Sequence, residues 1–318
     1  MRKIFTLFVA ALCCATMFAE EQALPGKFTV NAEGDQVQFS EGNLARNNND
    51  GDLYFIGPQS LLSHYGSVRW VYFCWGTGNN PTAARVQVDN FVDWGVNPIG
   101  SDTEGNLWRT LSADEWQYLI SGREHAEYLC GLAKITTQYE GLYPGLILFP
   151  DNLYVEPGYD SDGDRLNLPD GILFISYQDN SQFTYHSNNE YTESQWEALE
   201  QAGAVFMPES YFYDSDTYYN YQGMNAIWCW TSTPSANGNS SAKCLNITKD
   251  KKANNVIIDN QRHFSLPVRL VKDVDTSTGL ENIATPADKA RKVMMDGQLF
   301  LKLNTHTYNA TGQEIIVP

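Results

Sequence analysis

The sequence contains few basic residues. It has 21 Lys and Arg against 38 Asp and Glu, which gives a formal net charge of −17 over 318 residues. A protein that binds a polyanion neutralises phosphates with Lys and Arg, and this chain has no basic excess to offer. We therefore expect no nucleic-acid partner, and we interpret the acidity as a property that favours solubility outside the cell.

Long apolar runs are missing as well. Beyond the N-terminal segment, no stretch approaches the roughly 20 apolar residues that a transmembrane helix needs, so we expect no transmembrane segment. Residues 1–19 combine Arg2 and Lys3 with a short apolar run and small residues, which is typical of a secretory signal peptide. Cys13 and Cys14 leave lipidation as an alternative, although neither follows the Leu-x-small-Cys pattern.

Cysteine is scarce, and four cysteines follow the predicted signal peptide: Cys74, Cys130, Cys229 and Cys244. In an exported protein an even number of cysteines suggests disulfides, and four allow three pairings. We favour Cys229–Cys244, because both lie in strand-like segments beside the turn-rich residues 234–241, and closing such a loop stabilises by roughly 3 kcal/mol. The alternative is that all four are buried free thiols.

Metal-binding patterns are sparse. No two of the five His stand three or four residues apart, so we expect no zinc site. Asp160, Asp162 and Asp164 alternate as in the first half of a calcium-binding loop. The second half does not follow, because Arg165 stands where a turn Gly belongs and Gly171 replaces the bidentate Glu. An incomplete calcium site and a solvated acidic turn are the two interpretations.

Turn-forming and aromatic residues are abundant, with 24 Gly, 18 Tyr and 8 Trp. This composition predicts a folded protein with many short strands. Two capping boxes, Ser112 with Glu115 and Thr192 with Gln195, predict the two helices, and Gly203 is placed to end the second one. We therefore expect short strands together with two helices, which is the α+β class.

The region from residue 204 to residue 270 carries the strongest strand pattern, with apolar segments at residues 204–208, 227–231, 244–247 and 267–270. The loop between the first two segments is crowded with Tyr, Asp and Asn. Tyr offers a large contact area at low entropic cost and stacks on sugar rings, while Asp and Asn provide adaptable hydrogen bonds. The loop is either a ligand-binding surface or a segment whose aromatics fold back onto the sheet. Its candidate residues are Tyr211, Tyr213, Asp214, Asp216, Tyr218, Tyr219 and Tyr221.

Several segments together resemble a known family. They are residues 108–116 (WRTLSADEW), 145–151 (GLILFPD), 203–208 (GAVFMP), 230–233 (WTST) and 268–271 (VRLV). In this order they resemble the Fibrobacter-type major paralogous (FISUMP) domain, whose relatives share the C-type-lectin-like fold with formylglycine-generating enzymes. The resemblance covers about residues 28–272. It implies a secreted or surface module of a Gram-negative bacterium, with a twisted antiparallel sheet, two helices and long loops.

The C-terminal part has a different pattern. Residues 273–290 read as a polar linker, and residues 291–318 resemble the C-terminal sorting segment of proteins exported by type IX secretion, although they are shorter than a full sorting domain. This resemblance implies a small C-terminal β segment, contact with the secretion machinery and a location at the outer surface.

These observations lead to one main functional hypothesis and two alternatives. The main hypothesis is a binding module without catalytic activity that recognises a glycan or an extracellular protein through the Tyr/Asp/Asn loop. One alternative is an enzyme of the formylglycine-generating-related fold, an oxidoreductase or a hydrolase. Those enzymes use a pair of cysteines in their C-terminal part, but the surroundings of Cys229 do not match that active site. The other alternative is a structural component of a surface assembly.

Overall fold

The computed structural model describes most of the chain in two compact units, Met1–Val274 and Asp275–Pro318. The boundary between the units falls inside the predicted linker, whereas the predicted signal peptide lies outside the described residues. The described residues are 23–47, 49–56, 71–82, 85–137, 141–156, 165–176, 188–210, 212–214, 217–219, 226–249, 251–274, 291–295, 298–303, 306–309 and 314–315.

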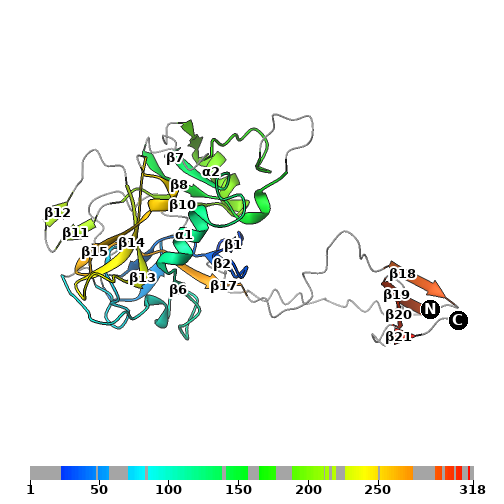
Figure 1. Cartoon of the computed structure of the whole chain (residues 1–318), viewed down its shortest axis with the longest axis horizontal. Helices are drawn as coiled ribbons and strands as arrows, with labels where there is room; N and C mark the ends of the chain where they lie inside the picture. The colour runs from blue at the N-terminus through cyan, green and yellow to red at the C-terminus, as the bar shows by residue number, and fades with distance from the viewer. Residues whose placement is uncertain are drawn as a thin grey trace, which may run out of the picture. The chain divides into compact units, whose positions relative to one another are not determined.

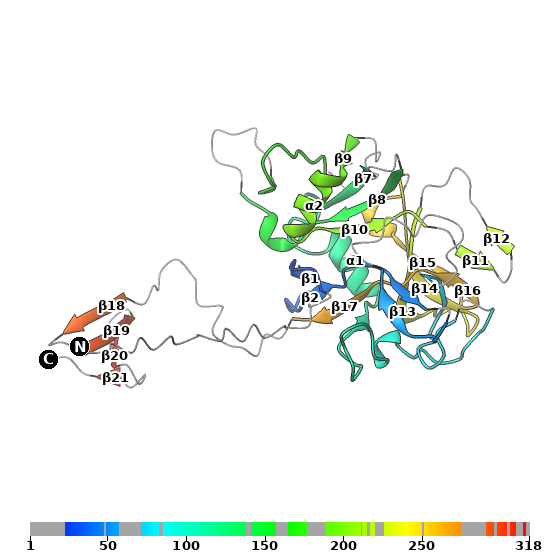
Figure 2. The same cartoon turned by 180° about the vertical axis from the view of Figure 1, so that it is seen from behind.

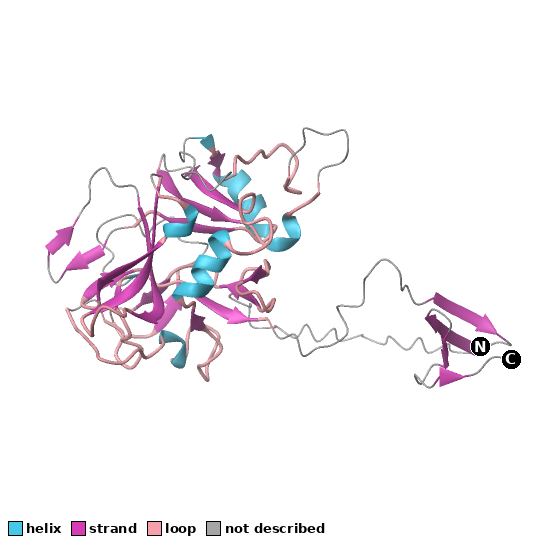
Figure 3. Cartoon of the chain, in the orientation of Figure 1, coloured by secondary structure: helices cyan, strands magenta, loops and turns pink. Residues whose placement is uncertain are grey.

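Strands dominate the first unit, and its two α-helices within the described residues are α1 (Ala113–Ser121) and α2 (Glu193–Gln201) (Figure 3). This arrangement confirms the α+β class. Short 3-10 turns are η3 (Trp94–Val96), η4 (Asp151–Leu153) and η6 (Ala253–Asn255). No helix in the described part of the chain is long and apolar enough to cross a membrane.

Both helices begin at the predicted capping boxes. At α1, the Ser112 hydroxyl accepts a hydrogen bond from the Glu115 backbone N–H (3.2 Å), and the Glu115 carboxylate accepts one from the Ser112 N–H (2.7 Å). Thr192 and Gln195 repeat this reciprocal pair at α2. Such caps satisfy N–H groups that have no partner inside the helix, and each contributes about 1 kcal/mol. After α2, Gly203 adopts a φ of +97°, as expected of a residue that ends a helix.

The described strands of the first unit form five small sheets, in which every strand pair is antiparallel except the parallel pair of β7 (Cys130–Thr136) and β9 (Glu190–Thr192). One sheet has the order β1 (Phe28–Thr29), β2 (Gln36–Phe39), β17 (Leu270–Asp273), β6 (Arg109–Thr110). A second has the order β10 (Val205–Pro208), β8 (Leu142–Leu148), β7 (Cys130–Thr136), β9 (Glu190–Thr192).

Three further sheets complete the described part of this unit. One has the order β12 (Thr217–Tyr219), β11 (Phe212–Asp214), β16 (Phe264–Leu266), β5 (Phe73–Cys74). Another has the order β13 (Ala226–Pro234), β14 (Ser241–Thr248), β15 (Ile257–Gln261). The third pairs β3 (Leu44–Arg46) with β4 (Leu53–Phe55). The hairpin of β11 and β12 lies at the periphery of the unit in both views (Figures 1 and 2).

The pair β13 and β14 is covered on both faces. Side chains along a strand alternate between the two faces of a sheet. Cys229 and Leu245 therefore share one face, where they join the cluster that contains Trp116 of α1. Trp230 and Cys244 share the other face and join a second cluster. This pair thus separates two hydrophobic cores.

A buried ion pair ties the β1–β2 hairpin to the core. The Arg123 side chain is 1% exposed, and its Nη1 lies 2.7 Å from Asp151 Oδ1. The other carboxylate oxygen of Asp151 accepts hydrogen bonds from the Thr29 N–H (2.8 Å) and hydroxyl (2.7 Å), and from the Gln36 amide (3.3 Å). The Arg123 guanidinium also lies 5.6 Å from the centre of the Phe28 ring.

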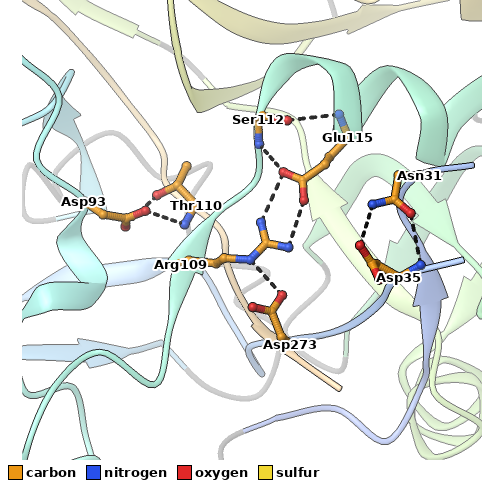
Figure 4. A network of polar contacts seen from close by, with 8 residues as sticks. All are labelled: Asn31, Asp35, Asp93, Arg109, Thr110, Ser112, Glu115 and Asp273. Atoms are coloured by element: carbon orange, nitrogen blue, oxygen red, sulfur yellow. Dashed lines mark hydrogen bonds and ion pairs between the residues drawn. The ribbon is translucent and has the colours of Figure 1, made fainter. Parts of the chain in front are cut away.

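A second polar network links α1 to the sheet beneath it (Figure 4). Arg109 of β6 donates to both carboxylate oxygens of Glu115 (2.8 and 3.1 Å) and to Asp273 of β17 (2.8 Å). Bidentate pairs of this kind fix geometry as well as charge. Because Glu115 also belongs to the α1 capping box, the start of the helix and the edge of the sheet are held together.

The second unit contains an antiparallel meander, β18 (Arg291–Met295), β19 (Gln298–Leu303), β20 (His306–Asn309) and β21 (Glu314–Ile315). Each strand pairs with the next along the chain. The small C-terminal β segment expected at residues 291–318 is therefore present as four strands.

We predict that Asp151→Ala destabilises the first unit by roughly 2–4 kcal/mol, because it leaves the buried Arg123 charge without its partner. Urea unfolding at pH 7 measures the change. The control is Glu190→Gln, which breaks the more exposed pair between Lys134 and Glu190 (3.1 Å) and is expected to cost less than about 1 kcal/mol. Equal losses in the two variants would contradict the structural role of the Arg123 pair.

Candidate functional site

The predicted Tyr/Asp/Asn loop contains the hairpin of β11 and β12. Its register pairs Phe212 with Tyr219, Tyr213 with Tyr218 and Asp214 with Thr217, and β11 continues into the rest of the sheet through β16. Three further predicted site residues lie outside the described residues: Tyr211, Asp216 and Tyr221.

Tyr213 is not part of an exposed surface. It is 4% exposed, and its ring meets the Tyr72 ring edge to face at 4.6 Å. Ala45 and Val71 complete this small hydrophobic cluster. For Tyr213 the structure thus corrects the expectation of a ligand contact, since alternation along β11 turns its side chain to the face opposite Phe212 and Asp214.

Asp214 lies at a charged cluster beside the hairpin. Its Oδ1 is 3.5 Å from His263 Nε2 and 3.4 Å from Arg85 Nη1. Burial lowers the pKa of His263, the Arg85 charge lowers it further, and Asp214 opposes both effects. His263 is therefore mainly neutral at pH 7. The cluster offers hydrogen-bond donors and acceptors at a partly exposed position.

Four rings form a continuous row next to this cluster. The ring centres of His263 and Phe264 are 4.8 Å apart, those of Phe264 and Phe212 are 5.0 Å apart, and those of Phe212 and Trp228 are 5.3 Å apart. Phe212 is buried in the middle, whereas Trp228 and Phe264 are partly exposed. We call His263, Phe264, Phe212 and Trp228 the aromatic row. Partly exposed aromatic faces with nearby polar groups are typical of ligand sites.

Arg262 lies in the turn that precedes β16 and that contains His263 of the aromatic row, and its contacts hold this turn in place. Its guanidinium lies 4.3 Å from the centre of the Trp75 ring and donates to the carbonyl groups of Ser241 (2.9 Å) and Asp89 (2.8 Å). These contacts bury Arg262 immediately before His263. A rigid support of this kind reduces the entropy that a ligand must remove on binding.

Asn246 lies beside Trp228, the ring at one end of the aromatic row. In β14 it is directly opposite Trp228, and it is 5% exposed. Its backbone N–H donates to Val256 (2.7 Å), but its side-chain Nδ2 has no hydrogen-bond partner among the described residues. A buried donor without a partner costs roughly 1–3 kcal/mol, so such groups call for an explanation.

Glu209 follows β10 and precedes Ser210, whose hydroxyl accepts a hydrogen bond from the Trp228 N–H at 3.4 Å. Burial raises the pKa of Glu209 to about 8. This carboxyl group is therefore largely protonated at pH 7, which makes it a neutral acid near one end of the aromatic row. A single carboxylic acid gives no reaction by itself.

The expected disulfide between Cys229 and Cys244 is not formed. In the β13–β14 register Cys229 is opposite Leu245, and Cys244 is opposite Trp230. The two cysteines are thus offset by one position and point to opposite faces, where each is a buried free thiol. Burial raises the pKa of Cys130 and Cys229 to about 12 and that of Cys244 further. Cys74 is also buried, so the alternative of four buried thiols describes the fold.

The candidate calcium residues Asp160, Asp162 and Asp164 lie outside the described residues. Within the part of the chain that the structure describes, no group of three or more His, Cys, Asp or Glu is arranged to hold a metal ion.

The site residues predicted from the sequence include Asp214 but none of the four rings of the aromatic row. Phe212 stood within the predicted loop, and Trp228 within a predicted strand, without a role for either. His263 and Phe264 come from a turn about 50 residues later, and no local pattern connects them to the loop. The available signal was the alternation of aromatics at Trp228 and Trp230, which shows that one face of this strand is aromatic.

Comparison of the chain with protein-family models, with curated proteins and with solved structures gave no match.

We predict that a reducing agent leaves the thermal unfolding midpoint of the protein unchanged, since the four described cysteines are buried thiols and Cys229 and Cys244 point to opposite faces of their sheet. Scanning calorimetry with and without dithiothreitol measures this. Native protein is also expected to resist thiol labelling that succeeds after unfolding. A midpoint several degrees lower under reduction would show that a disulfide exists after all.

We predict that Glu209 makes stability depend on pH. Its folded-state pKa of about 8 lies above its ordinary value of 4.5, so the folded protein holds the proton more tightly than the unfolded chain does. The resulting stabilisation is complete below about pH 4.5 and is lost as the pH rises through 8, by roughly 1–4 kcal/mol.

Urea unfolding at pH 5, 6.5 and 8 measures this contribution. Glu209→Gln mimics the protonated acid, and we expect its stability to fall less than that of the wild type over this range. Glu190→Gln, at an exposed carboxylate, serves as control and is expected to keep the wild-type slope. If Glu209→Gln has the same slope as the control, the raised pKa is wrong.

Proposed function

We propose that the chain is a secreted or cell-surface binding module that recognises a glycan or an extracellular protein. The observation that carries this proposal is the aromatic row with its partly exposed ends, next to the Asp214 cluster and the β11–β12 hairpin. Aromatic anchors surrounded by a few polar groups provide most of the affinity at many binding sites. The ligand would contact Trp228, Phe264 and the hairpin that contains Tyr218 and Tyr219.

The resemblance to the FISUMP domain supports a C-type-lectin-like fold for this proposal, and the sorting-like tail supports export by type IX secretion to the outer surface of a Gram-negative bacterium. Both remain proposals. Calcium at Asp160, Asp162 and Asp164 also stays a prediction. Thiol chemistry receives no support, because the described cysteines are buried and burial raises their pKa values.

The test compares the full-length wild type with Trp228→Ala/Phe264→Ala on a glycan array and in pull-downs of extracellular proteins. We expect the double variant to lose at least about 2 kcal/mol of binding free energy, which is roughly thirtyfold in affinity. Tyr54→Ala removes an exposed aromatic on β4 and is the matched control, with affinity expected to stay unchanged. Circular dichroism checks that each variant is folded.

Tyr218→Ala/Tyr219→Ala/Tyr221→Ala tests the hairpin separately. A fall in affinity only in the Trp228 and Phe264 variant would place the ligand on the aromatic row, and a fall in both would include the hairpin. Equal binding by the wild type, the double variant and the hairpin variant would reject this site.

A further inference from the structure

Asn246 places a polar amide on a buried face of β14 where its Nδ2 makes no hydrogen bond with a described residue. Ala242, Cys244 and Asn246 alternate along β14 and share the face of Trp228 and Trp230. On the opposite face Leu245 is buried in the core next to α1. Asn246 is thus an amide within an otherwise aromatic and apolar face.

The Asn246 amide is close to the exposed end of the aromatic row. Residues directly opposite each other in an antiparallel pair have Cβ atoms about 4.5–5.5 Å apart, which places Asn246 beside the Trp228 indole. Trp228 is partly exposed and packs edge to face on Phe212. The amide Nδ2 is itself buried and has no hydrogen-bond partner among the described residues, so a ligand on the Trp228 face reaches it only when the Asn246 side chain turns toward that face.

A donor beside an aromatic face matches the chemistry of a sugar ring. The C–H face of a pyranose packs on an aromatic ring, and its hydroxyl and ring oxygens accept hydrogen bonds from buried donors. At the other end of the row, Asp214 accepts and Arg85 donates, which suits hydroxyl groups because they do both. The net charge of −17 disfavours an acidic polymer.

We infer that the ligand of this site is a neutral carbohydrate, and that Asn246 Nδ2 donates a hydrogen bond to an oxygen of the sugar that stacks on Trp228. This inference rests on the proposed function, because it assigns the ligand class and a further binding residue to the same site. Among the residues that the structure describes this donor is buried and has no partner, so its hydrogen bond would form when a sugar binds and the side chain turns toward it.

The decisive variant is Asn246→Leu, which has nearly the same size but lacks the donor. Since a buried donor without a partner destabilises the ligand-free protein, we expect the unfolding midpoint of Asn246→Leu to equal or exceed that of the wild type. We expect its affinity for sugar to be at least tenfold lower. Asn246→Ala, which adds no volume, is measured in parallel and is expected to show the same loss of affinity.

Isothermal titration calorimetry and tryptophan fluorescence of the full-length protein measure binding of cellotetraose, mannotetraose, galactotetraose and tetra-N-acetylchitotetraose. Asn255→Leu, at an exposed amide of η6, is the control and is expected to bind as the wild type does. Loss of affinity in both Asn246 variants, with a stable Asn246→Leu, supports the inference.

Two results would overturn it. Unchanged sugar affinity in both Asn246 variants would remove the amide from the site, and no binding of any of the four sugars by the wild type would reject the carbohydrate class. In the second case the proposed function is judged separately, because capture of an extracellular protein that depends on Trp228 and Phe264 would preserve the binding module with a different ligand.

Discussion

The burial of the β13–β14 pair on both faces is the constraint on which the rest of the first unit depends. A strand that is covered on one face only can bury every second residue, whereas this pair must satisfy two cores at once. The cluster that contains Trp116 lies on one face, and the cluster that contains Trp230 lies on the other. Each core therefore fixes the register for the other, because a shift by one residue would exchange the two sets of side chains.

Polar contacts hold the outer elements of the first unit to its core. Asp151 binds both Arg123 and the β1–β2 hairpin, so one carboxylate holds a helix-terminal turn and a peripheral hairpin to the core. Glu115 has a similar double role, since it caps α1 and binds Arg109 of the neighbouring sheet. The face around Trp228 is one place where aromatic and polar groups meet near solvent.

The candidate site follows from the same architecture. β13, β11 and β16 each contribute a ring to the aromatic row, and the turn before β16 contributes His263. The other face of β14 is packed in a hydrophobic core through Leu245. The strand therefore keeps its register although Asn246, whose buried Nδ2 has no partner among the described residues, lowers the stability of the fold. A rigid scaffold that tolerates a polar group of this kind is typical of binding sites, where stability is exchanged for function.

The sequence by itself determined the local features: the two capping boxes at Ser112 and Thr192, the helix end at Gly203 and the α+β class. These depend on residues within a few positions of one another. Only the tertiary structure decided which way each side chain points. The local pattern favours a disulfide between Cys229 and Cys244 and a ligand contact at Tyr213. Strand register instead places the two cysteines on opposite faces and Tyr213 against Tyr72. Register arises from contacts between segments far apart in the chain, and a shift by one residue reverses every assignment, so local patterns do not contain it.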